Sequence, residues 1–177
     1  MNVIKFLSKL RRPFKDKMVM RGWVVAELRG PDGQVKQRVE QHNLVTDQGD
    51  IFAASAIYTG AFAAWGMKLG TASTAASKSG AGSFIAVGDY VSGSNKALDD
   101  STPKAGGAND ITQFRRLYAA GEGTDATINR VAIVGNTDDN GEADATDTYA
   151  IAVFAAQIAK GADDTLTVTW NVTYTGA

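Results

Sequence analysis

The sequence of 177 residues contains no cysteine. Disulfide bonds, thiolate metal sites and cysteine nucleophiles are therefore excluded. Such a chain has to be held together by side-chain packing and backbone hydrogen bonds, which fits assembly in a reducing cytoplasm. Proline is also scarce, with three residues, whereas the 19 glycines indicate frequent turns.

Histidine occurs once, as His42. A lone histidine has no second imidazole with which to bind a metal ion, and no G-x-S-x-G sequence supplies a serine nucleophile. The phosphate-binding sequence G-x-x-x-x-G-K-[ST] is absent too. We therefore expect His42 to be a structural, hydrogen-bonding residue, and we expect neither enzymatic activity nor a cofactor.

Long apolar segments are missing as well. No stretch approaches the roughly 18 consecutive apolar residues that a membrane span needs. Residues 1–17 lack the uninterrupted apolar core and the small-residue cleavage site of a secretory signal. The sequence therefore predicts neither membrane insertion nor secretion.

The formal net charge of −1 conceals an uneven distribution. Residues 1–17 contain six cationic residues and one acidic residue, Asp16, which gives +5. The remainder contains 12 cationic and 18 acidic residues, which gives −6. A basic N-terminal arm, residues 1–17, thus precedes an acidic body.

The arm has apolar residues at helical spacing, which predicts a short amphipathic helix over residues 2–12. These apolar residues are Val3, Phe6, Leu7 and Leu10. So short a helix is marginal alone in water, so it should order against a partner; a disordered basic tail is the alternative. A protein groove with acidic walls and an apolar floor suits this pattern better than nucleic acid or a membrane surface. The candidate partner-binding residues are Lys5, Phe6, Lys9, Leu10, Arg11, Arg12 and Phe14.

The first part of the body predicts a β-hairpin followed by a helix. Residues 18–29 and 34–41 are rich in strand-forming or alternating residues, and the intervening GPDG is a strong turn signal. Residues 47–58 predict the helix, with Thr46 or Asp47 as its cap and Ile51, Ala54 and Tyr58 on one face.

The remainder predicts strands around one long excursion. Strands are expected over residues 63–70, 113–118, 127–134, 148–159 and 165–174. The last of these alternates apolar and polar residues throughout, with Trp170 as a core anchor. Residues 71–110, rich in small residues, are expected to cross the surface, with a short strand over 83–91. The predicted fold is mainly β: residues 18–177 form a single antiparallel β-sandwich or barrel-like domain with one short helix and the basic arm.

One loop has the spacing of a calcium site. Oxygen-bearing side chains occupy positions 1, 3, 5, 9 and 12 of a twelve-residue loop with Gly141 at position 6. These candidate metal ligands are Asn136, Asp138, Asn140, Asp144 and Asp147. A calcium loop usually has Asp at position 1 and Glu at position 12, whereas this loop has Asn and Asp there. The segments on either side of the loop also predict strands and not the helices of such a site. A solvated acidic hairpin loop without metal is therefore the favoured interpretation.

Several segments, in their order along the chain, resemble a group of tailed-bacteriophage structural proteins. After the hairpin come HNLVTDQG (42–49), the helix, WGMKLGT (65–71), INRVAIV (128–134) and the closing KGADDTLTVTWNVTY (160–174). The similarity runs from about residue 18 onward. Arg130 stands where many relatives carry an acidic residue, so subunit contacts are expected to differ there.

The resemblance implies a non-enzymatic virion protein present in many copies. A capsid decoration or cement protein fits best, bound to the major capsid protein or other virion subunits through its arm. A homo-oligomer, with a trimer as the guess, is expected. A tail, baseplate or fibre-adaptor protein is the second interpretation. A small hydrolase or carbohydrate-binding sandwich, using carboxylates of 136–147 or Trp65, is the third.

Overall fold

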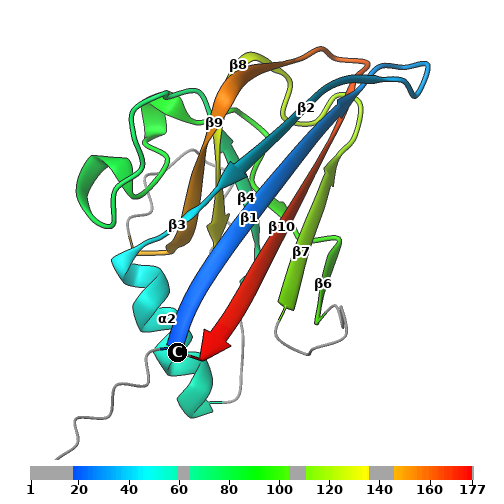
Figure 1. The fold of residues 1–177 in the computed structure, drawn as a ribbon. Helices are drawn as coiled ribbons and strands as arrows, with labels where there is room; N and C mark the ends of the chain where they lie inside the picture. The colour runs from blue at the N-terminus through cyan, green and yellow to red at the C-terminus, as the bar shows by residue number, and fades with distance from the viewer. Residues whose placement is uncertain (1–17, 60–63, 104–110, 136–145, 177) are drawn as a thin grey trace, which may run out of the picture.

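A computed structural model of the protein describes residues 18–59, 64–103, 111–135 and 146–176. Two antiparallel sheets pack face to face, and one α-helix extends from one end of them (Figure 1). The expectation of a mainly β, antiparallel sandwich is confirmed, and the described residues include one short α-helix.

The first sheet is centred on the last strand of the sequence. Its order is β2 (Val35–His42), β1 (Met18–Arg29), β10 (Thr165–Gly176), β7 (Ile111–Tyr118) and β6 (Asp100–Pro103). Strands β1 and β10 pair in continuous register from Met18 opposite Gly176 to Arg29 opposite Thr165. Strands far apart in sequence therefore form the middle of this sheet.

The second sheet has two long strands flanked by shorter ones. Its order is β3 (Leu44–Val45), β9 (Thr148–Lys160), β8 (Asp125–Val134), β4 (Gly66–Gly70) and β5 (Lys96–Ala97). Strand β4, flanked by β8 and β5, is buried along its whole length. Strands with both faces covered are expected to carry near-continuous apolar runs, and β8 and β9 do so.

The core forms where the alternating apolar residues of the two sheets meet. In β10, Leu166, Val168, Trp170 and Val172 are buried, whereas the intervening threonines are half-exposed. Trp170 is fully buried, as expected of a core anchor. The expected hairpin is also present: Gly33 adopts a φ of +78° in the turn, and its N–H donates to the carbonyl of Gly30 at 2.9 Å.

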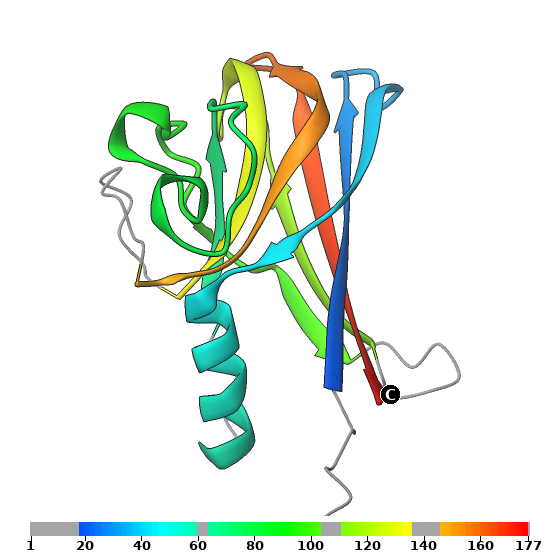
Figure 2. The ribbon, with the colours of Figure 1, turned by 60° about the vertical axis from the view of Figure 1, so that its left-hand side comes forward.

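Residues 71–90 lie over the outer face of the second sheet (Figure 2, green). Ile85 packs there against Ala132, Val134 and Ile151, which form a second small apolar cluster. The expected short strand over 83–91 is wrong. These residues contain the short 3-10 helix η2 (Val87–Asp89), preceded by η1 (Gly80–Gly82), because small residues and glycines favour tight turns here.

Arg130 on β8 fastens this segment to the sheet. Its side chain is buried, and it donates hydrogen bonds to the carbonyl oxygens of Ala72 (2.8 Å), Thr74 (2.7 Å) and Phe84 (3.3 Å). Burial lowers the pKa of Arg130. In the described chain Arg130 thus bonds to its own segment 72–84, and the expectation that subunit contacts differ at this position stays a prediction.

Candidate functional site

Helix α2 (Asp47–Thr59) is attached to the sandwich through its N-terminal half. The Thr46 hydroxyl accepts a hydrogen bond from the N–H of Gly49 (2.9 Å) and donates one to the carbonyl of Thr148 (2.6 Å). Phe52 stacks on Tyr149 with the ring centroids 3.9 Å apart. The expected helix is thus confirmed, with Thr46 as its cap.

The C-terminal half of α2 projects beyond the sandwich (Figure 2). Ile51, Ile57 and Tyr58 are 58%, 73% and 92% exposed. The face predicted from Ile51, Ala54 and Tyr58 is therefore directed to solvent, not to the sheets. Each residue turns a helix by about 100°, so Phe52 and Ile57 project from sides of α2 that differ from the side shared by Ile51 and Tyr58. The helix therefore has apolar side chains on several sides. A helix that is apolar all round is normally buried, so α2 lacks part of the cover that its sequence suits.

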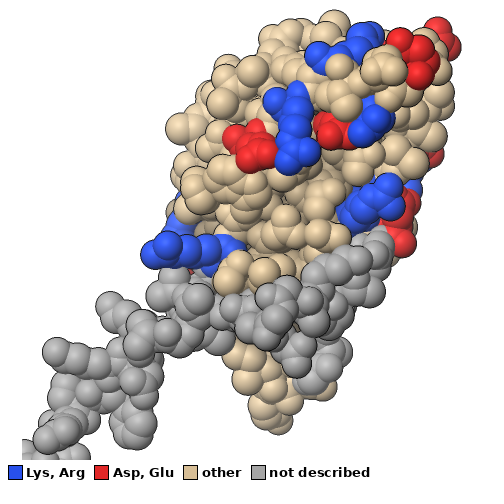
Figure 3. All heavy atoms as spheres, turned by 45° about the vertical axis from the view of Figure 1, so that its right-hand side comes forward, with Lys and Arg blue, Asp and Glu red and all other residues tan. Residues whose placement is uncertain are grey.

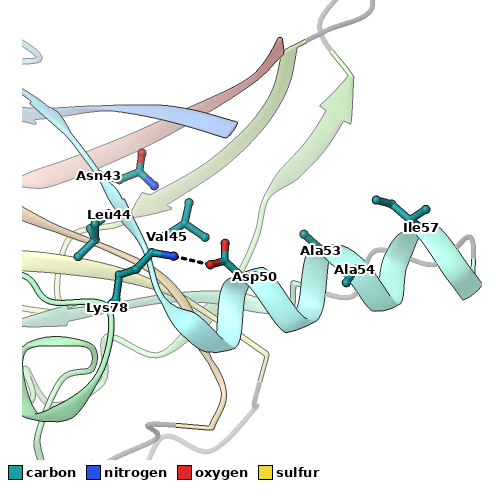
Figure 4. A pocket seen from close by; sticks show the side chains of 8 residues that line it. All are labelled: Asn43, Leu44, Val45, Asp50, Ala53, Ala54, Ile57 and Lys78. Carbon is teal, nitrogen blue, oxygen red and sulfur yellow. Dashed lines mark hydrogen bonds and ion pairs between the residues drawn. The ribbon is translucent and has the colours of Figure 1, made fainter. Parts of the chain in front are cut away.

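A groove of about 380 Å³ runs between α2 and β3 (Figure 4). It is lined by Asn43, Leu44, Val45, Asp50, Ala53, Ala54, Ile57 and Lys78. Strand β3 is at the edge of its sheet, so one of its sides has no neighbouring strand among the described residues. The groove therefore offers an apolar floor beside an open strand edge.

A second, smaller cavity of about 40 Å³ lies where α2 meets the interior of the sandwich. Phe52 and Ala53 of the helix line it together with Phe114 and Val172 of the first sheet. Asn43 lines both hollows, and its buried amide oxygen and nitrogen have no hydrogen-bond partner within the described part of the chain. Unpaired buried polar atoms cost free energy, so the segment that leads into α2 is not optimised for the isolated chain.

The charges around the groove are mostly acidic. Asp50 forms an ion pair with Lys78, and Asp47 lies 3.9 Å from the same ammonium group. The hydrogen bond to Asp50 is the main cause that raises the pKa of Lys78. The last turn of α2 has no basic residue that would offset the negative end of the helix dipole. A cationic, amphipathic segment would complement this surface.

The outer face of the first sheet has a different character. Cationic and acidic side chains are interleaved there (Figure 3), and neighbouring ones pair, as Arg38 does with Glu27 and Glu40. A shallow hollow of about 270 Å³ on this face is lined by Glu27, Arg29, Arg38, Arg115 and residues with short side chains. Exposed pairs of this kind contribute little binding energy.

The described residues do not form a metal-binding cluster. Among them, no group of three or more His, Asp and Glu side chains is placed to hold a metal ion. His42 is exposed and contacts Trp23 edge-on, with the ring centroids 4.4 Å apart. This aromatic contact is structural, and the expected hydrogen bond of His42 stays a prediction.

Most residues singled out from the sequence lie outside the described residues. This holds for the arm residues Lys5, Phe6, Lys9, Leu10, Arg11, Arg12 and Phe14, and for Asn136, Asp138, Asn140 and Asp144 of the acidic loop. Asp147 is described: it precedes β9, and its carbonyl accepts a hydrogen bond from the N–H of Gly135 (2.9 Å). Trp65 is half-buried beside β4.

The sequence interpretation did not anticipate the groove beside α2. Asn43, Ile57 and Lys78 come from three separate segments, and only the fold brings them together. One signal was present in the sequence: Ile57 falls off the face shared by Ile51 and Tyr58. An apolar residue there indicates a helix that requires cover on more than one side.

Comparisons with protein-family models, curated proteins and solved structures found no match. Of the helices within the described ranges, none combines the length and the apolar character required to traverse a bilayer.

Proposed function

We propose that this chain is a non-enzymatic structural protein of a tailed-bacteriophage virion, and that it acts as a capsid decoration or cement protein. The observation that carries the proposal is the exposed apolar surface of α2. Ile57 and Tyr58 are 73% and 92% exposed on a helix whose described contacts with the sandwich include the Thr46 cap and the Phe52–Tyr149 stack in its N-terminal half. Exposed apolar surface of this kind marks sites of protein association.

The order of the sequence segments that resemble phage structural proteins supports the virion assignment. The sandwich supports it further, because a rigid body held by extensive strand pairing is a suitable scaffold for presenting one docking element. We take the major capsid protein, or another virion subunit, as the partner, with a homo-oligomer of this chain on the shell.

The size of α2 supports a contribution from the arm. A stable interface buries about 800 Å² on each partner. A helix of 13 residues that is already half attached to its own body offers less than this. Residues 1–17, with their apolar and cationic side chains, add the missing surface.

The proposal is tested by mixing the purified protein with shells that lack it and measuring co-sedimentation. Replacing Ile57 or Tyr58 by Asp places an unpaired charge in the interface, which should weaken binding at least about tenfold. Deleting residues 1–17 should leave a folded body that no longer binds shells. Val87→Asp is the matched control, because Val87 is an exposed apolar residue (58%) far along the chain in the segment 71–90.

Undiminished decoration by the Ile57→Asp, Tyr58→Asp and deletion variants would refute this function. The location within the virion is read from fractionated particles. Recovery of the protein with isolated tails, and not with heads, would replace the capsid role by that of a tail, baseplate or fibre-adaptor protein.

A further inference from the structure

We propose that, in the free subunit, residues 1–17 dock on α2 and its groove within the same chain, and that this contact shields α2 until the subunit meets the shell. The shielding role rests on the proposed function. The contact itself is a property of the isolated protein and is tested without any particle.

The first argument is chemical complementarity. The arm places Val3, Phe6, Leu7 and Leu10 at helical spacing, which suits an apolar groove floored by Val45, Ala53 and Ile57. The arm has a formal charge of +5. The groove and helix present Asp47, Asp50 and a C-terminal end without basic residues, against the single cation Lys78 that lines the groove.

The second argument is position. Strand β1 begins at Met18, and its first residues lie at the end of the sandwich from which α2 projects (Figures 1 and 2). Gly22 of β1 is in direct contact with Asn43, which lines the groove. The arm therefore leaves the body close to the surface that it is proposed to cover.

The third argument is length. Residues 13–17, if extended, span at most about 18 Å. Residues 2–12 would form a helix about 16 Å long, against about 20 Å for the 13 residues of α2. One short connection therefore suffices to bring the arm alongside most of the projecting helix.

The tether also favours the arm of the same chain, over the arm of a second copy, as the segment that occupies the groove. A segment held by a short linker has an effective concentration in the millimolar range. A second copy in dilute solution does not reach this concentration. The arm of the same chain is therefore the preferred occupant before assembly.

The absence of cysteine makes the contact directly measurable. In the full-length protein carrying Leu10→Cys and Ile57→Cys, mild oxidation should give an intramolecular disulfide in most chains, visible as a faster-migrating monomer. The matched pair Leu10→Cys and Asp32→Cys should give little, because Asp32 lies in the turn at the other end of β1. Equal yields from both pairs, or disulfide-linked dimers as the main product, would overturn the proposal.

A second measurement does not require a covalent bond. Phe6→Ser with Leu10→Ser should raise the fluorescence of an apolar dye such as ANS several-fold, because α2 becomes uncovered. The same pair should have little effect in a protein that already carries Ile57→Ser, since the two changes then remove the same contact. The matched control is Lys15→Ser, which leaves the apolar stripe of the arm intact and should not change the fluorescence. Independent, additive effects would count against docking.

The shielding role is tested on particles with a second cysteine pair, Val3→Cys and Ser55→Cys, because neither residue is assigned a part in shell binding and Ser55 is exposed on α2. The oxidised form should fail to decorate shells, and reduction should restore binding. Equal binding by both forms would overturn shielding. Failure of both forms, with the disulfide formed as expected, would instead refute the virion function.

Discussion

The side chain of Asn43 occupies the space beside Gly22 that a Cβ atom would need. A Cβ built on Gly22 would overlap the amide group of Asn43, whose backbone N–H also donates to the carbonyl of Gly22 at 3.2 Å. Glycine at position 22 is therefore required by a neighbour on the segment that leads into α2, and β1 is coupled to the helix through this contact.

We expect Gly22→Ala to destabilise the protein by about 1–3 kcal/mol, because the added methyl group displaces Asn43. Asn43→Ala alone should be close to neutral, since it removes two buried polar atoms without hydrogen-bond partners. Combined, the two substitutions should recover most of the loss, as measured by urea unfolding of all four proteins. Additive effects would show that the overlap is not the cause.

Tyr118 is fully buried, and its hydroxyl donates a hydrogen bond to the carbonyl of Met67 (3.0 Å), which links the two sheets. Tyr118→Phe should cost about 1–3 kcal/mol at neutral pH, because a buried acceptor loses its donor. Burial raises the pKa of Tyr118 far above its ordinary value. The neutral Tyr118 hydroxyl therefore contributes fully to the free energy of unfolding below about pH 10, where tyrosine in the unfolded chain ionises. This contribution is lost as the pH rises above that value.

Denaturant titrations at pH 7 and in the alkaline range check this prediction. The difference in unfolding free energy between the parent and Tyr118→Phe should shrink above about pH 10. A constant difference across this range would contradict it.

Lys36 on β2 and Asp164 before β10 form an ion pair at 2.9 Å, and the side chain of Asp164 is 5% exposed. The hydrogen bond from Lys36, followed by that from the N–H of Gly161, lowers the pKa of Asp164. The resulting stability is present above about pH 4, the range of an unfolded aspartate, and is lost as the pH falls through the lower folded value. Asp164→Asn should therefore lower the Tm at neutral pH.

The parent and Asp164→Asn should converge in Tm as the solution is acidified. The exposed neighbour Asp163 provides the control, since Asp163→Asn should change neither the Tm at neutral pH nor its acid dependence. A gap between parent and Asp164→Asn that persists at acid pH would show that charge is not its origin.

Arg130→Lys should release the segment 71–86 from the second sheet. Lysine has no planar fork with which to reach Ala72, Thr74 and Phe84 together, so these part-buried carbonyl groups lose their donors. We expect a loss of about 2 kcal/mol or more and faster amide hydrogen exchange in this segment. Arg115→Lys, at an exposed position, is the control; equal exchange in the two variants would contradict the role of Arg130.

The strands with strong local signals could be predicted from the sequence. The alternation around Trp170 and the turn at Gly33 depend on neighbouring residues only, so their prediction was accurate. The cover formed by residues 71–90 could not be anticipated, because it depends on Arg130, which is distant in sequence, and on sheet positions that only the completed fold creates. The incorrect prediction of a strand over residues 83–91 arose because these long-range contacts cannot be read from the local sequence.

The candidate site was predicted less completely than the fold. The helix and its cap at Thr46 follow from local chemistry, and both were found. The exposure of Ile57 follows from how far α2 extends past the sheets, which no local pattern encodes. The groove depends on Lys78, which the fold brings to Asp50 from a segment without regular structure.

The pairing of β1 with β10 has a consequence for synthesis of the protein. The centre of the first sheet is the strand made last, so β1 and β7 have no common neighbour until β10 has left the ribosome. A nascent chain therefore cannot complete this sheet before β10 has been synthesised. Shortened products that end before β10 should be degraded, so only full-length copies accumulate.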